Sequence, residues 1–214
     1  MSLLSPVYAV FPGLAYRRLA RKLLESVASS DTSDRIIAAA RVRHETYRNA
    51  RPQHSIGVNL LMRHLEWDLA LFEAAITEGL SETDAGTVVS TVKWKVFGPL
   101  STLAFRISRI RGRSVEKRVG WLLDTIFKVL FTRPFQRTVL RDDGLAFDVT
   151  GCPMARYCQD HGVPQLTRHA ACDVDYRMAQ AWRVRLDRTQ TLATGGSCCD
   201  FRFRVDTPSM PNEC

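Results

Sequence analysis

Apolar residues recur every three or four positions along residues 14–131, which is the spacing of amphipathic helices. Ser55 and Gly79 bracket the clearest case, because serine often caps a helix start and glycine often ends one. Its apolar positions are Val58, Leu61, Leu65, Leu69, Phe72 and Ile76. The pattern predicts helices over residues 14–29, 33–50 and 55–78, then one after Ser81 and one over 114–131, with breaks at Pro99 and Gly112.

After Pro134 the apolar period changes to two, which is typical of strands. Short strands are predicted at 137–141 and 145–150 around an Asp-Asp-Gly turn, and at 182–192 and 198–205 around Gly195-Gly196. Between them, Pro153 begins a short helix and residues 164–181 form another. We therefore predict an α+β protein with a helical, basic part (1–135). A cysteine-containing module (136–214) of order ββααββ follows, its antiparallel sheet covered by helices and packed with the first part as one globular unit.

The net charge of +8 comes entirely from the helical part. Residues 1–135 carry 20 Lys and Arg against 12 Asp and Glu, whereas residues 136–214 carry 10 of each. The densest run, from Arg106 to Arg118, holds six basic residues and Glu116. Two interpretations are open: the run is a solvated helix face and turn, or it attracts phosphates or an anionic membrane surface. No zinc-finger or RNA-binding motif accompanies it, so no nucleic-acid partner is expected.

The helix predicted after Ser114 is unusually apolar, and we expect it to pack within the protein, with a homodimer interface as the next alternative. No window of about 18 uncharged apolar residues indicates a transmembrane segment. The first positive charges follow the apolar start, which is the reverse of a secretory signal, so a cytoplasmic protein with reduced cysteines is expected.

All six cysteines lie between Cys152 and Cys214. Cys152 precedes Pro153 and a helix, whose positive end would favour a thiolate. In the helix over 164–181, a polar face is predicted to combine His169, Cys172, Asp173 and Tyr176, with Asp175 at the edge of the apolar stripe. Such a face is either an activated thiol nucleophile or an exposed polar surface with one buried thiol.

The last two predicted strands add further candidates. Alternation places Cys199 on the core side, and it places Arg188 and Gln190 in an otherwise apolar row. A buried arginine needs a partner, so Arg188 is either a clamp for an anion or one half of an ion pair with Asp148 or Asp175. Cys152, Cys172 and Cys199 could alternatively hold zinc with a carboxylate or histidine, although no Cys-x-x-Cys pair supports this.

Four blocks of residues resemble the L-2-amino-thiazoline-4-carboxylic acid hydrolase family. Their order and spacing agree with that family, and a weaker similarity extends the likeness over roughly residues 45–206. The blocks are Phe147 to Pro153, Cys172 with Asp175, Arg188 to Leu192, and Gly195 to Phe201.

The resemblance implies hydrolytic opening of a C–N bond in a small cyclic amidine, imidate or amide that carries an anionic group. No cofactor is expected, with zinc as the alternative. A non-catalytic binding module for a small ligand, with a fold like that of four-vinyl reductases, is the second hypothesis. The expected catalytic residues are Cys172, Cys152, Asp175, His169 and Cys199, and the expected substrate-binding residues are Arg188, Gln190 and Tyr176.

Overall fold

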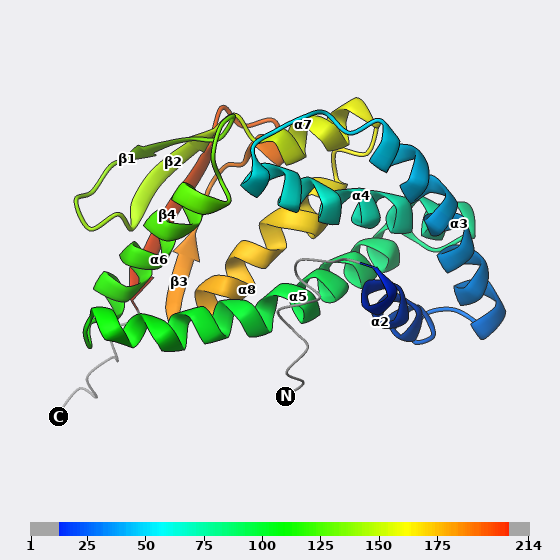
Figure 1. Cartoon of the computed structure of the whole chain (residues 1–214), viewed down its shortest axis with the longest axis horizontal. Helices are drawn as coiled ribbons and strands as arrows, with labels where there is room; N and C mark the ends of the chain where they lie inside the picture. The colour runs from blue at the N-terminus through cyan, green and yellow to red at the C-terminus, as the bar shows by residue number, and fades with distance from the viewer. Residues whose placement is uncertain (1–12, 206–214) are drawn as a thin grey trace, which may run out of the picture.

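The computed structural model describes residues 13–205 and confirms the α+β class. Within these residues five helices come first, and a four-stranded antiparallel sheet follows at one end of the molecule (Figure 1). The helices are α2 (Leu14–Leu24), α3 (Ser30–Asn49), α4 (Ile56–Thr77), α5 (Glu82–Ile107) with the 3₁₀ turn η1 (Ser108–Arg111), and α6 (Val115–Val129).

Serine side chains cap four of these helices. Ser29, Ser55, Ser81 and Ser114 each accept a hydrogen bond from the backbone N–H three residues later, which satisfies a donor that the helix itself leaves unpaired. The predicted cap at Ser33 is therefore wrong, since Ser33 lies buried inside α3.

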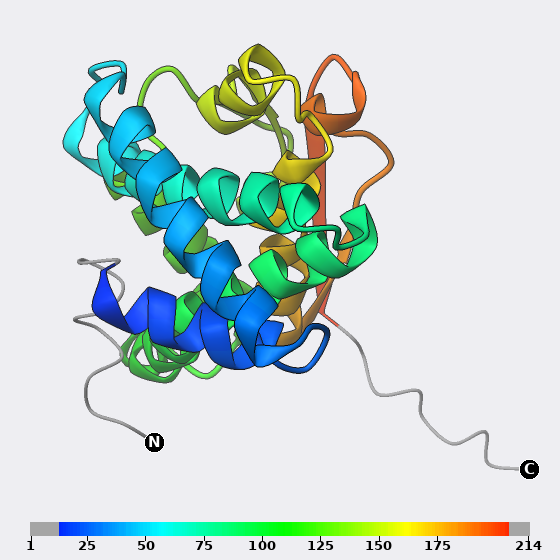
Figure 2. The same cartoon turned by 90° about the vertical axis from the view of Figure 1, so that its right-hand side faces the viewer.

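The predicted break at Pro99 is also wrong, because α5 continues through it. Proline usually disrupts a helix interior, where it removes one backbone hydrogen bond. Helix α5 contacts α2, α4, α6 and α8, so tertiary packing on several sides outweighs this local penalty. The perpendicular view shows α3 lying across α4 and α2 in the same helical body (Figure 2).

The sheet has the strand order β1-β2-β4-β3, and every neighbouring pair is antiparallel. Its strands are β1 (Gln136–Val139), β2 (Ala146–Thr150), β3 (Val184–Asp187) and β4 (Cys199–Val205). Phe147 on β2 stacks on Phe201 of β4, with ring centroids 5.0 Å apart. The central strand pair thus presents an aromatic surface.

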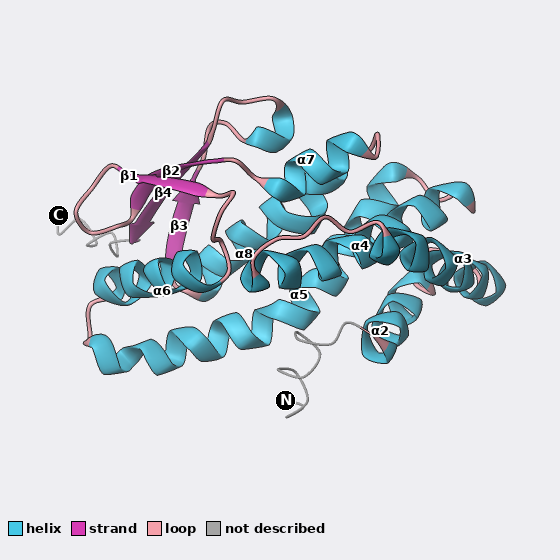
Figure 3. Ribbon diagram, turned by 45° about the horizontal axis from the view of Figure 1, so that its top comes forward, coloured by secondary structure: helices cyan, strands magenta, loops and turns pink. Residues whose placement is uncertain are grey.

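Between the two hairpins lie α7 (Pro153–Asp160), a π-helical turn η2 (Arg168–Cys172) and α8 (Asp173–Ala181). Residues 164–181 were predicted as one regular helix, whereas the π turn interrupts it. A π turn holds more residues than an α turn, so it rotates the side chains that follow. Figure 3 shows the sheet standing beside α6 and α8.

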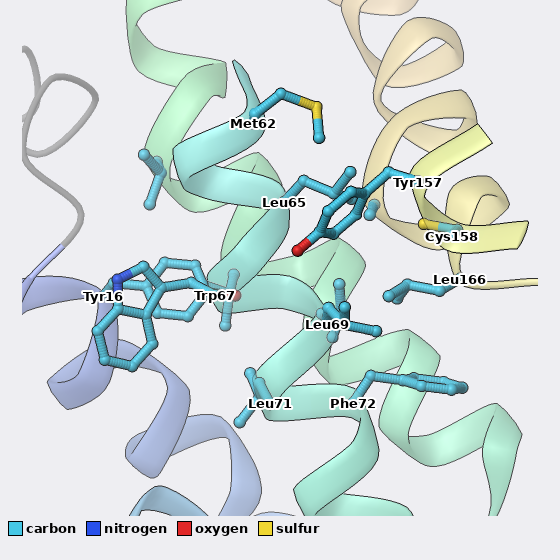
Figure 4. Packing of buried hydrophobic residues seen from close by; sticks show 14 of the residues in the cluster. Tyr16, Met62, Leu65, Trp67, Leu69, Leu71, Phe72, Tyr157, Cys158 and Leu166 are labelled. Carbon is cyan, nitrogen blue, oxygen red and sulfur yellow. The ribbon is translucent and has the colours of Figure 1, made fainter. Parts of the chain in front are cut away.

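One hydrophobic core joins the helical part to the cysteine-containing part. Tyr157 and Leu166 come from the later part of the chain, and they lie beside Leu65 and Leu69 of α4 (Figure 4). The expected packing of α6 is observed too, because Val119, Leu122 and Leu123 are buried in this core. The division of the chain at residue 135 stays a prediction.

Candidate active site

A cavity of about 190 Å³ lies where helices α4, α5, α6 and α8 face strands β2 and β4. Most of its wall is apolar, and seven phenylalanines contribute: Phe97, Phe127, Phe131, Phe135, Phe147, Phe201 and Phe203. Five chemically active side chains also line it, and we refer to them as the Arg188 cluster: Cys152, Cys172, Asp175, Arg188 and Cys199. The cavity wall is therefore mostly apolar, and the Arg188 cluster supplies it with thiol, carboxyl and guanidinium groups.

The charged centre of the Arg188 cluster is the ion pair between Arg188 and Asp175. The Arg188 side chain is 1% exposed; its Nη1 donates to Asp175 Oδ2 at 2.9 Å and its Nη2 donates to the Cys172 carbonyl at 3.2 Å. The guanidinium lies between the rings of Tyr176 and Phe201, at 4.9 and 5.0 Å from their centroids. Its Nε is buried and makes no hydrogen bond with the described residues. Of the alternatives for Arg188, the ion pair with Asp175 is present, and one donor is still free.

Burial shifts the proton affinity of Asp175. It raises the pKa of this carboxyl to about 6, although the neighbouring Arg188 opposes the rise. A carboxyl with such a pKa changes protonation near neutral pH, which suits a general base.

Asp200 fixes the backbone that directly follows Arg188, and sequence reasoning missed this role. Its carboxylate accepts hydrogen bonds from the Thr189 N–H, the Thr189 hydroxyl and the Gln190 N–H. Burial raises the pKa of Asp200, but the combined hydrogen bonds outweigh burial and the net pKa is lowered. These bonds end β3 at Asp187 and turn the chain, so the predicted strand over 182–192 is too long. The Thr-Gln pair following an arginine was the available signal.

Three thiols face the cavity around this ion pair. Cys152 caps α7 and accepts a hydrogen bond from the Ala155 N–H at 3.4 Å, and Cys199 accepts one from the Leu192 N–H at 3.3 Å. Cys172 ends the π turn. Electrostatic interactions couple each of the three to the other thiols, to Asp175 or to Arg188.

Burial raises the pKa of these thiols, opposite to the activation expected at Cys152. The pKa is about 11 for Cys152 and about 12 for Cys172, and that of Cys199 is raised as well. The hydrogen bond from Ala155 at the start of α7 lowers the Cys152 pKa, but desolvation is the larger effect. In the free protein the three thiols are therefore protonated at neutral pH.

The other predicted site residues lie outside the cavity wall. His169 is 3.5 Å from Asp173 and packs against α5, so closely that a Cβ on Gly86 would sit 2.5 Å from its ring. Gln190 lies against the Gly195-Gly196 turn. Tyr176 contributes only the ring beneath Arg188. The predicted face shared by His169 and Cys172 is thus divided, with Cys172 in the cavity wall and His169 against α5.

The helical wall contains polar residues that sequence reasoning missed. Lys93 of α5 and His64 of α4 line the cavity, and Lys93 pairs with the fully buried Asp68. Tyr16 donates to the other oxygen of Asp68 at 2.6 Å. The available signal was one charged residue within an apolar run, as in Trp67-Asp68-Leu69.

The described residues were also compared with the geometry of a metal site and of a membrane-spanning helix. Across residues 13–205 no group of three or more His, Cys, Asp or Glu side chains is placed to hold a metal ion. In the same part of the chain, no helix has the length and apolar character needed to cross a membrane. Cys214, the sixth cysteine, lies outside the described residues.

Comparison with known proteins finds one similarity. The model of the L-2-amino-thiazoline-4-carboxylic acid hydrolase family matches residues 99–203, just under half of the chain. No curated protein and no solved structure matches significantly. The matched segment contains the whole Arg188 cluster together with Asp200, whereas the expected likeness between residues 45 and 98 is absent from it. The match supports a hydrolase of this type.

Proposed function

We propose that this chain is a hydrolase that opens a C–N bond in a small cyclic amidine, imidate or amide bearing an anionic group. The cavity containing the Arg188 cluster would be its active site. The observation that carries the proposal is the buried Arg188 guanidinium, because Arg188 lines the cavity and its Nε–H has no hydrogen-bond partner among the described residues. Buried polar groups normally have partners, so an unpaired donor on a cationic residue of the cavity wall suits a bound anion.

The roles of the other residues follow from their chemistry. Asp175, with a pKa of about 6, is the proton acceptor. Cys172 is the favoured nucleophile and Cys152 the next, since both line the cavity and interact electrostatically with Asp175. Because each thiol is protonated, its proton must leave as the sulfur attacks.

The proposed reaction has two stages. The thiol adds to the ring carbon that is bonded to nitrogen, and Asp175 takes the thiol proton. The C–N bond then breaks with a proton transferred from Asp175 to the leaving nitrogen, so the substrate remains attached through sulfur. Water next attacks the same carbon, Asp175 accepts its proton, and the thiolate leaves and is reprotonated. The net change is the addition of one water across the C–N bond.

The apolar wall bears on the kind of substrate. Phe127, Phe147 and Phe201 would enclose the part of the substrate away from the anionic group. Burial of that part is favourable only when it is apolar. We therefore propose a substrate whose ring carries apolar substituents, with Arg188 holding its anion and the thiols reaching its C–N bond.

A non-catalytic binding module is the second candidate. The raised pKa values of all three cavity thiols favour a binding module, because the thiols of the free protein are protonated and the thiolate is the nucleophilic form. A binder needs the same cavity and Arg188, but neither Asp175 as a base nor a nucleophile.

Single Cys→Ser variants at positions 152, 172 and 199 test the proposal. Cys198→Ser is the matched control, because Cys198 is the neighbouring half-buried thiol and does not line the cavity. Consumption of thiazoline carboxylates and related rings would be followed by mass spectrometry. Loss of the nucleophile should lower kcat by several powers of ten, as with other covalent catalysts.

Two outcomes would count against the proposal. Full activity in all three cavity variants would exclude thiol catalysis and leave Asp175-activated water. Saturable binding of these rings to the unmodified protein with no turnover would instead establish the binding module.

A further inference from the structure

The outer side of α5, near its C-terminal end, and the following turn η1 carry a stripe of exposed aliphatic side chains. Leu100, Leu103, Ile107 and Ile110 are 39, 44, 53 and 76% exposed, and exposure increases toward η1. Their spacing of three and four places them on one side of the helix. Single exposed apolar residues are ordinary, but four in line form a continuous patch, which marks a binding surface.

The surroundings of this stripe are strongly basic. Between Ala85 and Leu123 the chain has eight Lys and Arg and only one acidic residue, Glu116. Two of the eight are buried: Lys93 pairs with Asp68, and Arg118 donates to the Phe105 carbonyl. The other six are exposed, namely Lys95, Arg106, Arg109, Arg111, Arg113 and Lys117. The stripe and these side chains together are named the α5 surface.

We propose that the α5 surface attaches the protein to an anionic lipid surface. Amphipathic helices of this type lie in the membrane plane, with aliphatic side chains among the acyl chains and arginines at the headgroups. Figure 1 shows the C-terminal half of α5 along an outer edge of the molecule, below α6 and β3.

The charge and apolar pattern disfavour other occupants. A second copy of the chain would bring two basic surfaces together, and like charges repel. A nucleic acid would engage the arginines but would leave the aliphatic stripe exposed to water. An acidic protein is the remaining competitor, and the experiment separates it from lipid. This attachment site is independent of the proposed hydrolase activity, since none of its residues lines the cavity.

Co-sedimentation with lipid vesicles tests the proposal. The full chain should bind vesicles of mixed phosphatidylserine and phosphatidylcholine, and should bind more weakly as salt rises, because salt screens exposed charges. Pure phosphatidylcholine vesicles should retain little protein. Ile107→Ser/Ile110→Ser and Arg106→Gln/Arg109→Gln should each weaken binding to the mixed vesicles by roughly tenfold or more, because each variant removes two side chains from the contact with the membrane.

Val42→Ser is the matched control, because Val42 on α3 is 68% exposed and lies away from the α5 surface. It should bind as the unmodified protein does, and circular dichroism verifies that every variant is folded. The proposal is overturned if the chain binds neither vesicle, if it binds both equally, or if both double variants bind like Val42→Ser. Absence of vesicle binding together with a dimer by light scattering would assign the α5 surface to self-association.

Discussion

Two buried ion pairs contribute side chains to the wall of the same cavity, Lys93 from one pair and both Arg188 and Asp175 from the other, and they differ in how fully their polar atoms are paired. Lys93 and Asp68 join two helices, and Tyr16 occupies the second oxygen of Asp68. Asp175 lies on α8 and Arg188 directly follows β3, and the Nε–H of Arg188 has no partner among the described residues. The pair of Lys93 and Asp68 has the features of a structural contact, whereas Arg188 in the second pair has a donor available for a ligand.

Proton affinity sharpens this contrast. Burial raises the pKa of both Asp68 and Asp175, against the opposing effect of their cationic partners. Asp68 is fully buried, while the side chain of Asp175 lines the cavity and is 22% exposed. Removal of Arg188 therefore removes the charge that opposes the rise in the Asp175 pKa, so Asp175 is protonated more readily.

The largest expected effect comes from breaking the helical pair. Asp68→Ala leaves Lys93 charged, buried and without its anion, and we expect a loss of about 3–5 kcal/mol in the free energy of unfolding. Urea denaturation followed by circular dichroism measures it. Adding Lys93→Met removes the stranded charge and should restore part of the stability. A double variant as unstable as the single one would show that the charge is not the cause.

Breaking the cavity pair should affect stability less and function more. In Arg188→Met, protonation of Asp175 at pH 7 costs at most about 1.4 kcal/mol for a carboxyl with a pKa of about 6. We therefore expect a stability loss of about 1–2 kcal/mol, together with a fall of at least about a hundredfold in kcat/KM for anionic substrates. Equal losses of stability in Arg188→Met and Asp68→Ala would remove the distinction between the two pairs.

The pH dependence isolates Asp175. Its folded pKa of about 6 exceeds the ordinary value of 3.8, so the folded state binds the proton more tightly. This contribution to stability is complete below pH 4 and is lost as pH rises toward 6, by up to about 1.4 kcal/mol per pH unit. Activity should change in the opposite direction, rising through pH 6 as the base becomes ionised. Asp175→Asn should abolish both trends, and trends that persist in that variant would point to another group such as Asp68.

The smallest effect concerns thiol reactivity. Cys158 is buried in the shared core and its pKa is raised to about 12, like that of Cys172 in the cavity. At pH 7.5 iodoacetamide should label both far more slowly in folded protein than in urea, because the thiolate is the reactive species. Peptide mass spectrometry identifies the labelled sites. Rapid labelling of Cys172 in the folded protein would show an activated thiolate.

Much of the architecture followed from local pattern. The change from a three-to-four-residue period to a period of two near Pro134 correctly separated helices from strands. Serine caps and glycine stops marked most helix ends within a few residues. The prediction failed at Pro99 and in the π turn over Arg168–Cys172, where tertiary packing overrides local preference.

The sequence by itself determined which residue types were available for chemistry: thiols confined to the last third, and one arginine in an apolar strand row. Only the tertiary structure decided that Asp175 and not Asp148 pairs with Arg188, that His169 turns toward Gly86, and that Lys93 joins the cavity wall. The physical reason is distance along the chain. Periodicity reports the face on which a side chain lies, whereas partners 13 or more residues apart are chosen by how the elements pack.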